Sequence, residues 1–259
     1  MRKLGICSDF TDESVNFSTL DKIKEAGFDS VFVGDYGDVE RRIEYALKIG
    51  LEVETIHSPF DGINAIWEIG DEGERMLARL KRTVEICKRY GIPISVVHVS
   101  SGDNPPRVSD VGLKRFDELI SYAKKSNVIL AFENLRKIGH LDSVLSAYKD
   151  DSTVGFCYDC GHENCFTKGI SYPELYGEKL VCVHLHDNSC KKNEDLHLLP
   201  FDGSIDFKKV AAKLREVKYR GTVMIETHKG NPFHENTTIE EYIKTAYERA
   251  DRIRNLLDE

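Results

Sequence analysis

Short runs rich in β-branched residues alternate along this chain with longer amphipathic segments. The eight runs are residues 3–7, 30–34, 51–57, 94–99, 128–134, 154–159, 180–187 and 221–227. Helical periodicity is found in residues 39–49, 73–90, 111–125, 207–218 and 238–257, and more weakly in 138–148. Strands that alternate with helices form parallel sheets. Over 259 residues this pattern predicts one closed (β/α)8 barrel domain, residues 1–259. An open doubly wound sheet is the alternative, but no G-x-G-x-x-G phosphate loop follows the first run.

Composition narrows the class of protein. A hydrophobic fraction of 41% can build a full core at this length without disulfides. The seven cysteines have no pairing pattern, the first residues have no apolar signal region, and no apolar run reaches the roughly 20 residues of a membrane helix. We therefore expect a cytoplasmic protein with no membrane partner, and the sequence leaves a homo-oligomer open. The net charge of −8 argues against nucleic acid and favours a small substrate.

Six predicted strands end in a side chain that can bind a metal ion. These side chains are His57, His98, Glu133, Asp159, His186 and Glu226. Catalytic residues of (β/α)8 barrels lie at this end of the strands. A lone histidine there is as often a hydrogen-bonded surface group as a ligand, but a lone carboxylate ending an apolar strand is costly without a cation. His184 and His186 share one face of their run, and we predict that His186, nearer the mouth, is the ligand and His184 a supporting residue.

Several motifs occur together with these residues. They are F-E-N at 132–134, D-x-G-H at 159–162, H-x-H-D at 184–187, and D-x-H-x-x-P-x-D-G-x-I-D-F at 195–207. Together with Glu226 they make the chain resemble the xylose isomerase-like TIM barrels, which include sugar (phosphate) isomerases and epimerases and also endonuclease IV.

The resemblance implies one divalent metal ion, Mn, Zn, Co or Mg, held by Glu133, Asp159, His186 and Glu226. It implies an isomerase or epimerase of a small sugar, sugar phosphate or polyol derivative. In such enzymes the metal stabilises an enediolate while a carboxylate removes the proton next to the carbonyl. Glu133 and Glu226 are the implied catalytic acid/base pair.

The same resemblance leaves two alternatives open. Endonuclease IV holds up to three zinc ions, and the matching residues His57, His98, His162, Asp195 and His197 are all present. A multi-zinc phosphodiesterase acting on abasic DNA is therefore the first alternative, whereas in a sugar enzyme these residues bind substrate or a further metal. A catalytically inactive sugar-binding relative is the second. Arg136, close to Glu133, is the candidate for binding a phosphate or another substrate anion.

The loops expected at the barrel mouth favour the sugar enzyme. Their acidic residues are Asp9, Asp12, Glu13, Asp35, Asp38, Asp61, Glu68, Asp103, Asp110, Glu194, Asp202 and Glu235. Their basic residues are Arg107, Arg136, Lys137, Lys168, Lys191, Lys192 and Lys229. An acidic rim repels DNA, so nucleic acid is disfavoured as a partner. The loop after His57 contains Phe60, Ile63, Ile66 and Trp67 and is interpreted as a hydrophobic lid over a small carbohydrate.

Overall fold

Eight parallel strands form a barrel in this protein, whose computed structural model describes residues 1–10, 17–230 and 233–259. The strands are β1 (Leu4–Cys7), β2 (Ser30–Gly34), β3 (Glu52–His57), β4 (Ile94–Val97), β5 (Ile129–Glu133), β6 (Val154–Asp159), β7 (Leu180–His184) and β8 (Val223–Ile225). They pair in the order β7-β6-β5-β4-β3-β2-β1-β8. A parallel bridge between Leu185 and Ile225 closes the ring. The predicted (β/α)8 barrel is confirmed.

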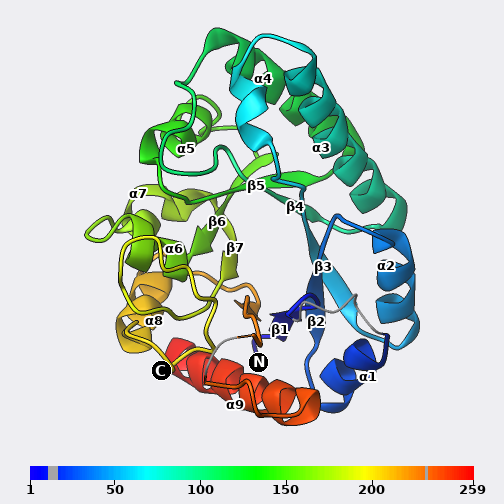
Figure 1. The fold of residues 1–259 in the computed structure, drawn as a ribbon, viewed down its shortest axis with the longest axis vertical. Helices are drawn as coiled ribbons and strands as arrows, with labels where there is room; N and C mark the ends of the chain where they lie inside the picture. The colour runs from blue at the N-terminus through cyan, green and yellow to red at the C-terminus, as the bar shows by residue number, and fades with distance from the viewer. Residues whose placement is uncertain (11–16, 231–232) are drawn as a thin grey trace.

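Helices surround the strands on the outside of the barrel (Figure 1). They are α1 (Phe17–Glu25), α2 (Val39–Lys48), α3 (Asp71–Tyr90), α4 (Asp110–Ser126), α5 (Ile138–Leu145), α6 (Cys160–Phe166), α7 (Tyr172–Tyr176), α8 (Phe207–Glu216) and α9 (Ile239–Asp258), with 3-10 turns η1 (Ile63–Trp67) and η2 (Gly177–Lys179). The short helices α6 and α7 are not predicted by the sequence, because five to seven residues are too few to establish a helical period. None of the described helices is long and apolar enough to cross a membrane.

The hydrophobic core has two parts, one outside and one inside the ring of strands. A large apolar cluster fills the space between the strands and the outer helices. A second cluster inside the barrel consists of small and β-branched residues, namely Ile94, Val96, Ala131, Cys157 and Cys182. Because this inner cluster fills the barrel below the strand ends, the polar side chains that end the strands gather above it.

The loop after β3 differs from its predicted role as a lid. Ile63, Ile66 and Trp67 are buried, and the indole Nε1 of Trp67 donates a hydrogen bond to the carbonyl oxygen of Val99 at 2.6 Å. This segment therefore packs into the core beside α3 and α4. Phe60, which is 50% exposed, is the one aromatic side chain of this loop that lines a cavity at the mouth.

Candidate metal centre

Histidine and carboxylate side chains converge at the carboxyl end of the barrel. Among the described residues they form overlapping groups in which all candidate ligand atoms lie within 4.8 Å of one another. The main groups are His57 with His98 and Glu133; Glu133 with Asp159, His184 and Glu226; and His162 with His186, Asp195 and His197. All five residues that the sequence predicts as additional ligands or substrate contacts are thus in this ensemble.

Glu133, the last residue of β5, joins two of these groups. Its Oε1 lies 2.8 Å from His184 Nδ1, and its Oε2 lies 2.8 Å from His98 Nε2 and 3.3 Å from His57 Nε2. Burial alone would raise the pKa of this carboxyl group, but the positive charge of His184 and hydrogen bonds from the three histidines outweigh burial and hold the pKa well below its usual range. Glu133 is therefore an ionised carboxylate with imidazole partners on both oxygens.

His184, rather than His186, lies with Glu133 and Glu226. Its Nδ1 is 2.8 Å from Glu133 Oε1 and 3.1 Å from Glu226 Oε2. The predicted ligand set with His186 is not brought together as one group, because β7 ends at His184 and the alternation of side chains stops there. The strand ends agree with this arrangement, since Glu133, Asp159 and His184 are each the last residue of their strand and Asp159 pairs in register with His184.

His186 belongs to the third group, on the opposite side of Asp159. Its Nε2 lies 3.1 Å from Asp159 Oδ1 and 3.7 Å from Asp195 Oδ1. Asp195 Oδ2 in turn lies 3.1 Å from His162 Nε2 and 3.4 Å from His197 Nε2. Burial would lower the pKa of His197, but Asp195 outweighs this effect and raises the pKa to about 9.

Two sequence motifs are explained by close packing at this centre. In F-E-N, the amide of Asn134 makes reciprocal hydrogen bonds with the backbone of Asp159, both 2.8 Å long, which fix the end of β6. In D-x-G-H, a Cβ atom on Gly161 would lie only 2.0 Å from Cε1 of His186. Glycine is therefore required for the His186 ring to reach Asp159.

Asp187 positions the long loop that carries Asp195 and His197. Its carboxylate accepts hydrogen bonds from the backbone N–H groups of residues 188, 201, 203 and 205, at 2.8–3.1 Å. A Cβ atom on Gly203 would lie 2.4 Å from Asp187 Oδ1, so this approach also requires glycine. The motif residues Asp187 and Gly203 therefore act on the site through the loop.

The donor atoms at this centre fit a divalent cation. Buried atoms without a hydrogen-bond partner among the described residues include His184 Nε2, His186 Nδ1 and Asp195 Oδ1. Buried polar atoms are rarely left unpaired, so several together indicate a missing partner. Mixed imidazole and carboxylate sets suit Zn, Mn, Co and Mg ions. These residues could therefore hold one metal ion or more.

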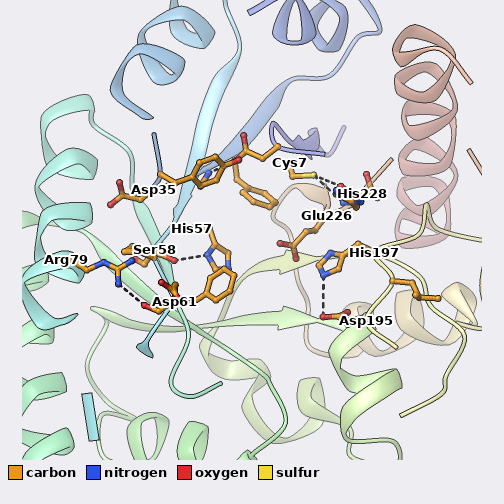
Figure 2. Close-up of a pocket in the computed structure, with 18 residues that line it drawn as sticks. Cys7, Asp35, His57, Ser58, Asp61, Arg79, Asp195, His197, Glu226 and His228 are labelled. Atoms are coloured by element: carbon orange, nitrogen blue, oxygen red, sulfur yellow. Dashed lines mark hydrogen bonds and ion pairs between the residues drawn. The ribbon is translucent and has the colours of Figure 1, made fainter. Parts of the chain in front are cut away.

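Two cavities open beside the ligand groups. The larger, of about 520 Å³, lies towards β1, β2 and β3, and Figure 2 shows His57 between Glu226 and the pair formed by Arg79 and Asp61. The smaller, of about 160 Å³, lies towards β4 and β5 and is also lined by Arg136. His57, Asp195, His197 and Glu226 line both cavities, so the ligand groups separate them.

The rim of the mouth is less acidic than the residue count predicts. Asp12 and Glu13 lie outside the described residues. Asp9 pairs with Arg42 at 2.7 Å, and Asp35 pairs with Arg82 and accepts a hydrogen bond from Thr83. These arginines belong to α2 and α3, not to the loops that the sequence places at the mouth. The rim charge therefore distinguishes a sugar from DNA less sharply than the sequence implies.

Comparisons with known proteins agree with this architecture. A family model described as a xylose isomerase-like TIM barrel matches residues 20–250. The y4fM protein of Sinorhizobium fredii is 29% identical over an alignment of 259 positions, which covers 83% of this chain and 82% of that protein.

Solved structures with the same fold include sugar epimerases. D-psicose 3-epimerase from Clostridium cellulolyticum H10 superposes with a TM-score of 0.77 at 16% identity, covering 98% of this chain and 99% of that one. A D-tagatose 3-epimerase-like protein has a TM-score of 0.74 at 23% identity, with 98% of both chains covered. At these identities the likeness concerns the fold.

Proposed function

We propose, since the chain belongs to the xylose isomerase-like TIM barrel family, that it is a divalent-metal-dependent isomerase or epimerase of a small sugar, sugar phosphate or polyol derivative. One observation carries the proposal. Glu133 and Glu226, which come from β5 and from the end of β8, approach the same His184 Nδ1 at 2.8 and 3.1 Å. Two ionised carboxylates thus converge on one point beside a substrate-sized cavity.

The two carboxylates differ in exposure, which suggests different roles. The Glu226 side chain is 16% exposed and lines both cavities, whereas the Glu133 side chain is fully buried and reaches the smaller cavity only. Burial would raise the pKa of Glu226, but the charge of His184 outweighs it and lowers the pKa, so Glu226 is ionised and able to accept a proton. We assign to Glu226 the removal of the proton beside the substrate carbonyl, and to Glu133 the opposite face of that carbon.

Glu133, Asp159, His184 and Glu226 would hold the metal ion. When bound, it would supply Lewis-acid stabilisation of the charge that develops on the substrate oxygens. The larger cavity of about 520 Å³ is the right size for a small carbohydrate, with Phe32, Tyr36 and Phe60 available to cover its apolar faces. The shared fold with D-psicose 3-epimerase supports the same reaction class.

A second candidate, phosphodiester hydrolysis with several zinc ions, is favoured by one specific observation. The flanking groups, one with His57 and His98 and one with His162, Asp195 and His197, also combine imidazole with carboxylate, but each has one carboxylate where the central group has three. Three metal ions close together would suit the attack and departure of phosphodiester oxygens.

Metal stoichiometry and isotope exchange test the proposal together. Titration with Mn²⁺ and Zn²⁺ is expected to saturate at one tight site per chain, and the loaded protein to exchange solvent deuterium into a ketose. Glu226→Gln is expected to abolish this exchange, and Glu216→Gln, the same change on the outside of the barrel, to leave it intact. Three tight metal sites with cleavage of abasic DNA and no exchange into any ketose would establish the second candidate instead.

A further inference from the structure

We propose that Arg136 forms an oxyanion-binding subsite beside the metal centre, so that the substrate is a sugar derivative carrying a carboxylate or a phosphate group. The inference rests on the proposed function and adds the class of substrate. It starts from the position of Arg136, three residues after Glu133 in the loop that leaves β5, on the wall of the smaller cavity.

Aromatic packing fixes the Arg136 side chain relative to the ligand groups. Its guanidinium carbon lies 3.7 Å from the centre of the Phe166 ring. The Phe166 ring in turn stacks on the His162 ring, with the ring centroids 5.2 Å apart and an angle of 27° between the ring planes. His162 Nε2 is 3.1 Å from Asp195. A guanidinium group stacked on a ring keeps its N–H donors in its own plane, where a carboxylate or phosphate can meet them in a fork.

The hydrogen-bonding capacity of Arg136 is largely unused. Among the described residues its nearest carboxylate is Asp103, with Oδ1 3.8 Å from Nε, and no hydrogen bond joins the two. The other oxygen of Asp103 accepts a hydrogen bond from Asn193 at 3.0 Å.

Arg42 provides a comparison within the same molecule. It also stacks on an aromatic ring, with its guanidinium carbon 4.4 Å from the centre of Tyr36. However, Arg42 donates hydrogen bonds to Asp9 and to the carbonyl oxygens of Gly34 and Tyr36. Arg42 therefore gives three of its five N–H donors to the fold, whereas Arg136 has the same kind of support and its donors to spare.

The smaller cavity has room for a charged substituent. Its volume is about 160 Å³, against about 520 Å³ for the larger cavity. Arg136 is the one lysine or arginine among the lining residues of the smaller cavity, and Ser100 and Ser101 also line this cavity. In the larger cavity the corresponding cation, Arg79, donates a hydrogen bond to the carbonyl oxygen of Asp61. The anionic group of the substrate is therefore assigned to the smaller cavity, beside Arg136, and its polyol chain to the larger cavity.

Binding of substrate-like polyols to the metal-loaded protein tests the subsite. D-sorbitol, D-sorbitol 6-phosphate and D-gluconate are suitable because none has an aldehyde or ketone group, so no isomerisation enters the measurement. Calorimetry is expected to give tighter binding of at least one anionic compound than of D-sorbitol. Arg136→Met should weaken binding of that compound by about 10- to 100-fold, the range for a charged hydrogen bond, and leave D-sorbitol unchanged. Arg136→Lys should restore part of the loss because the fork is lost and the charge kept.

Lys137→Met is the matched control, since it removes an adjacent, exposed positive charge that lines neither cavity. It should leave all three affinities unchanged. A loss specific to D-sorbitol 6-phosphate identifies a phosphate ester, and a loss specific to D-gluconate identifies a sugar acid. Equal affinities in wild type and Arg136→Met, or equal losses in Arg136→Met and Lys137→Met, overturn the subsite. Because no turnover is measured, this failure is distinct from an absence of sugar isomerisation.

Discussion

The carboxylates in the two halves of the barrel mouth have different partners. After β1 and β2, Asp9 and Asp35 are each paired with an arginine, Arg42 and Arg82. At the ends of β5, β6 and β8, the carboxylates lie against histidines: Glu133 against His57, His98 and His184, Asp159 against His162 and His186, and Glu226 against His184.

This difference separates structural carboxylates from candidate metal ligands. A guanidinium group is always charged and neutralises its carboxylate permanently. An imidazole can lose its proton, and the carboxylate beside it then requires another cation. The half with arginines is therefore complete as folded, and the half with histidines could hold a metal ion.

Removing one carboxylate from each half should have opposite consequences, and the loss of metal is the largest effect that we expect. Glu133→Gln removes an oxygen ligand shared by two groups. It should lower metal affinity by more than the roughly 10- to 100-fold that the loss of a supporting residue costs, and abolish activity. Calorimetric titration with Mn²⁺ measures this change.

Asp35→Asn is the matched substitution in the arginine half. Its side chain is 1% exposed, so breaking its pair should lower the free energy of unfolding and leave the number of bound metal ions unchanged. If Asp35→Asn loses metal as Glu133→Gln does, the division of the mouth into two halves is wrong.

Arg42→Met tests the structural half directly. The Arg42 side chain is only 5% exposed and that of Asp9 only 12%, so the substitution leaves the Asp9 carboxylate with hydrogen bonds from Ser8 and the Gly34 N–H but without a cation in a largely buried position. Breaking a buried ion pair from one side costs about 3–5 kcal/mol. Urea denaturation should show this loss in the free energy of unfolding, while the loaded protein at low temperature should bind metal as the wild type does. A loss below about 1 kcal/mol would place this pair with ordinary surface ion pairs.

The sequence predicts the barrel and the glutamates of the site, for physical reasons that can be identified. Glu133, Asp159 and Glu226 follow runs of apolar residues, and a charge in that position is visible without a structure. The exchange of His184 for His186 was not predictable from alternation, because the end of β7 depends on its pairing with β6 and β8. The pairing of Asp35 with Arg82 was not visible either, since it joins residues 47 positions apart.

The residues that support the ligands should have smaller effects than the ligands themselves. Asn134→Ala removes both hydrogen bonds to the backbone of Asp159. We expect metal affinity to fall by about 10- to 100-fold while the number of sites stays the same. Asn164→Ala, which changes an amide further from the ligands, serves as the control. Unchanged affinity in Asn134→Ala would mean that the strand pairing alone holds Asp159 in place.

Metal affinity should also depend on pH, by about tenfold per pH unit for each proton displaced. Burial would lower the pKa of His184, but Glu226 and Glu133 outweigh it and raise the pKa well above the usual value, so this imidazole is protonated at pH 7 before metal binds. Metal binding must remove this proton, and affinity should rise with pH until the raised pKa is passed. In the metal-free protein the same raised pKa contributes stability below the unfolded pKa of His184, and this stability is lost as pH rises through the folded value.

The number of protons released also distinguishes one metal ion from three. The central group contains one histidine with a raised pKa, His184, so a single ion should release about one proton at pH 7. Filling the third group would add protons from His162, whose pKa is raised by Asp159 and Asp195 against the effect of burial, and from His197. The first group would add none from His98, because burial lowers the pKa of that imidazole.

Calorimetry in two buffers with different ionisation enthalpies gives the number of protons released on metal binding. Release of about one proton supports the sugar enzyme, and release of about three supports the multi-metal phosphodiesterase. A binding enthalpy that does not depend on the buffer contradicts the protonated state of His184.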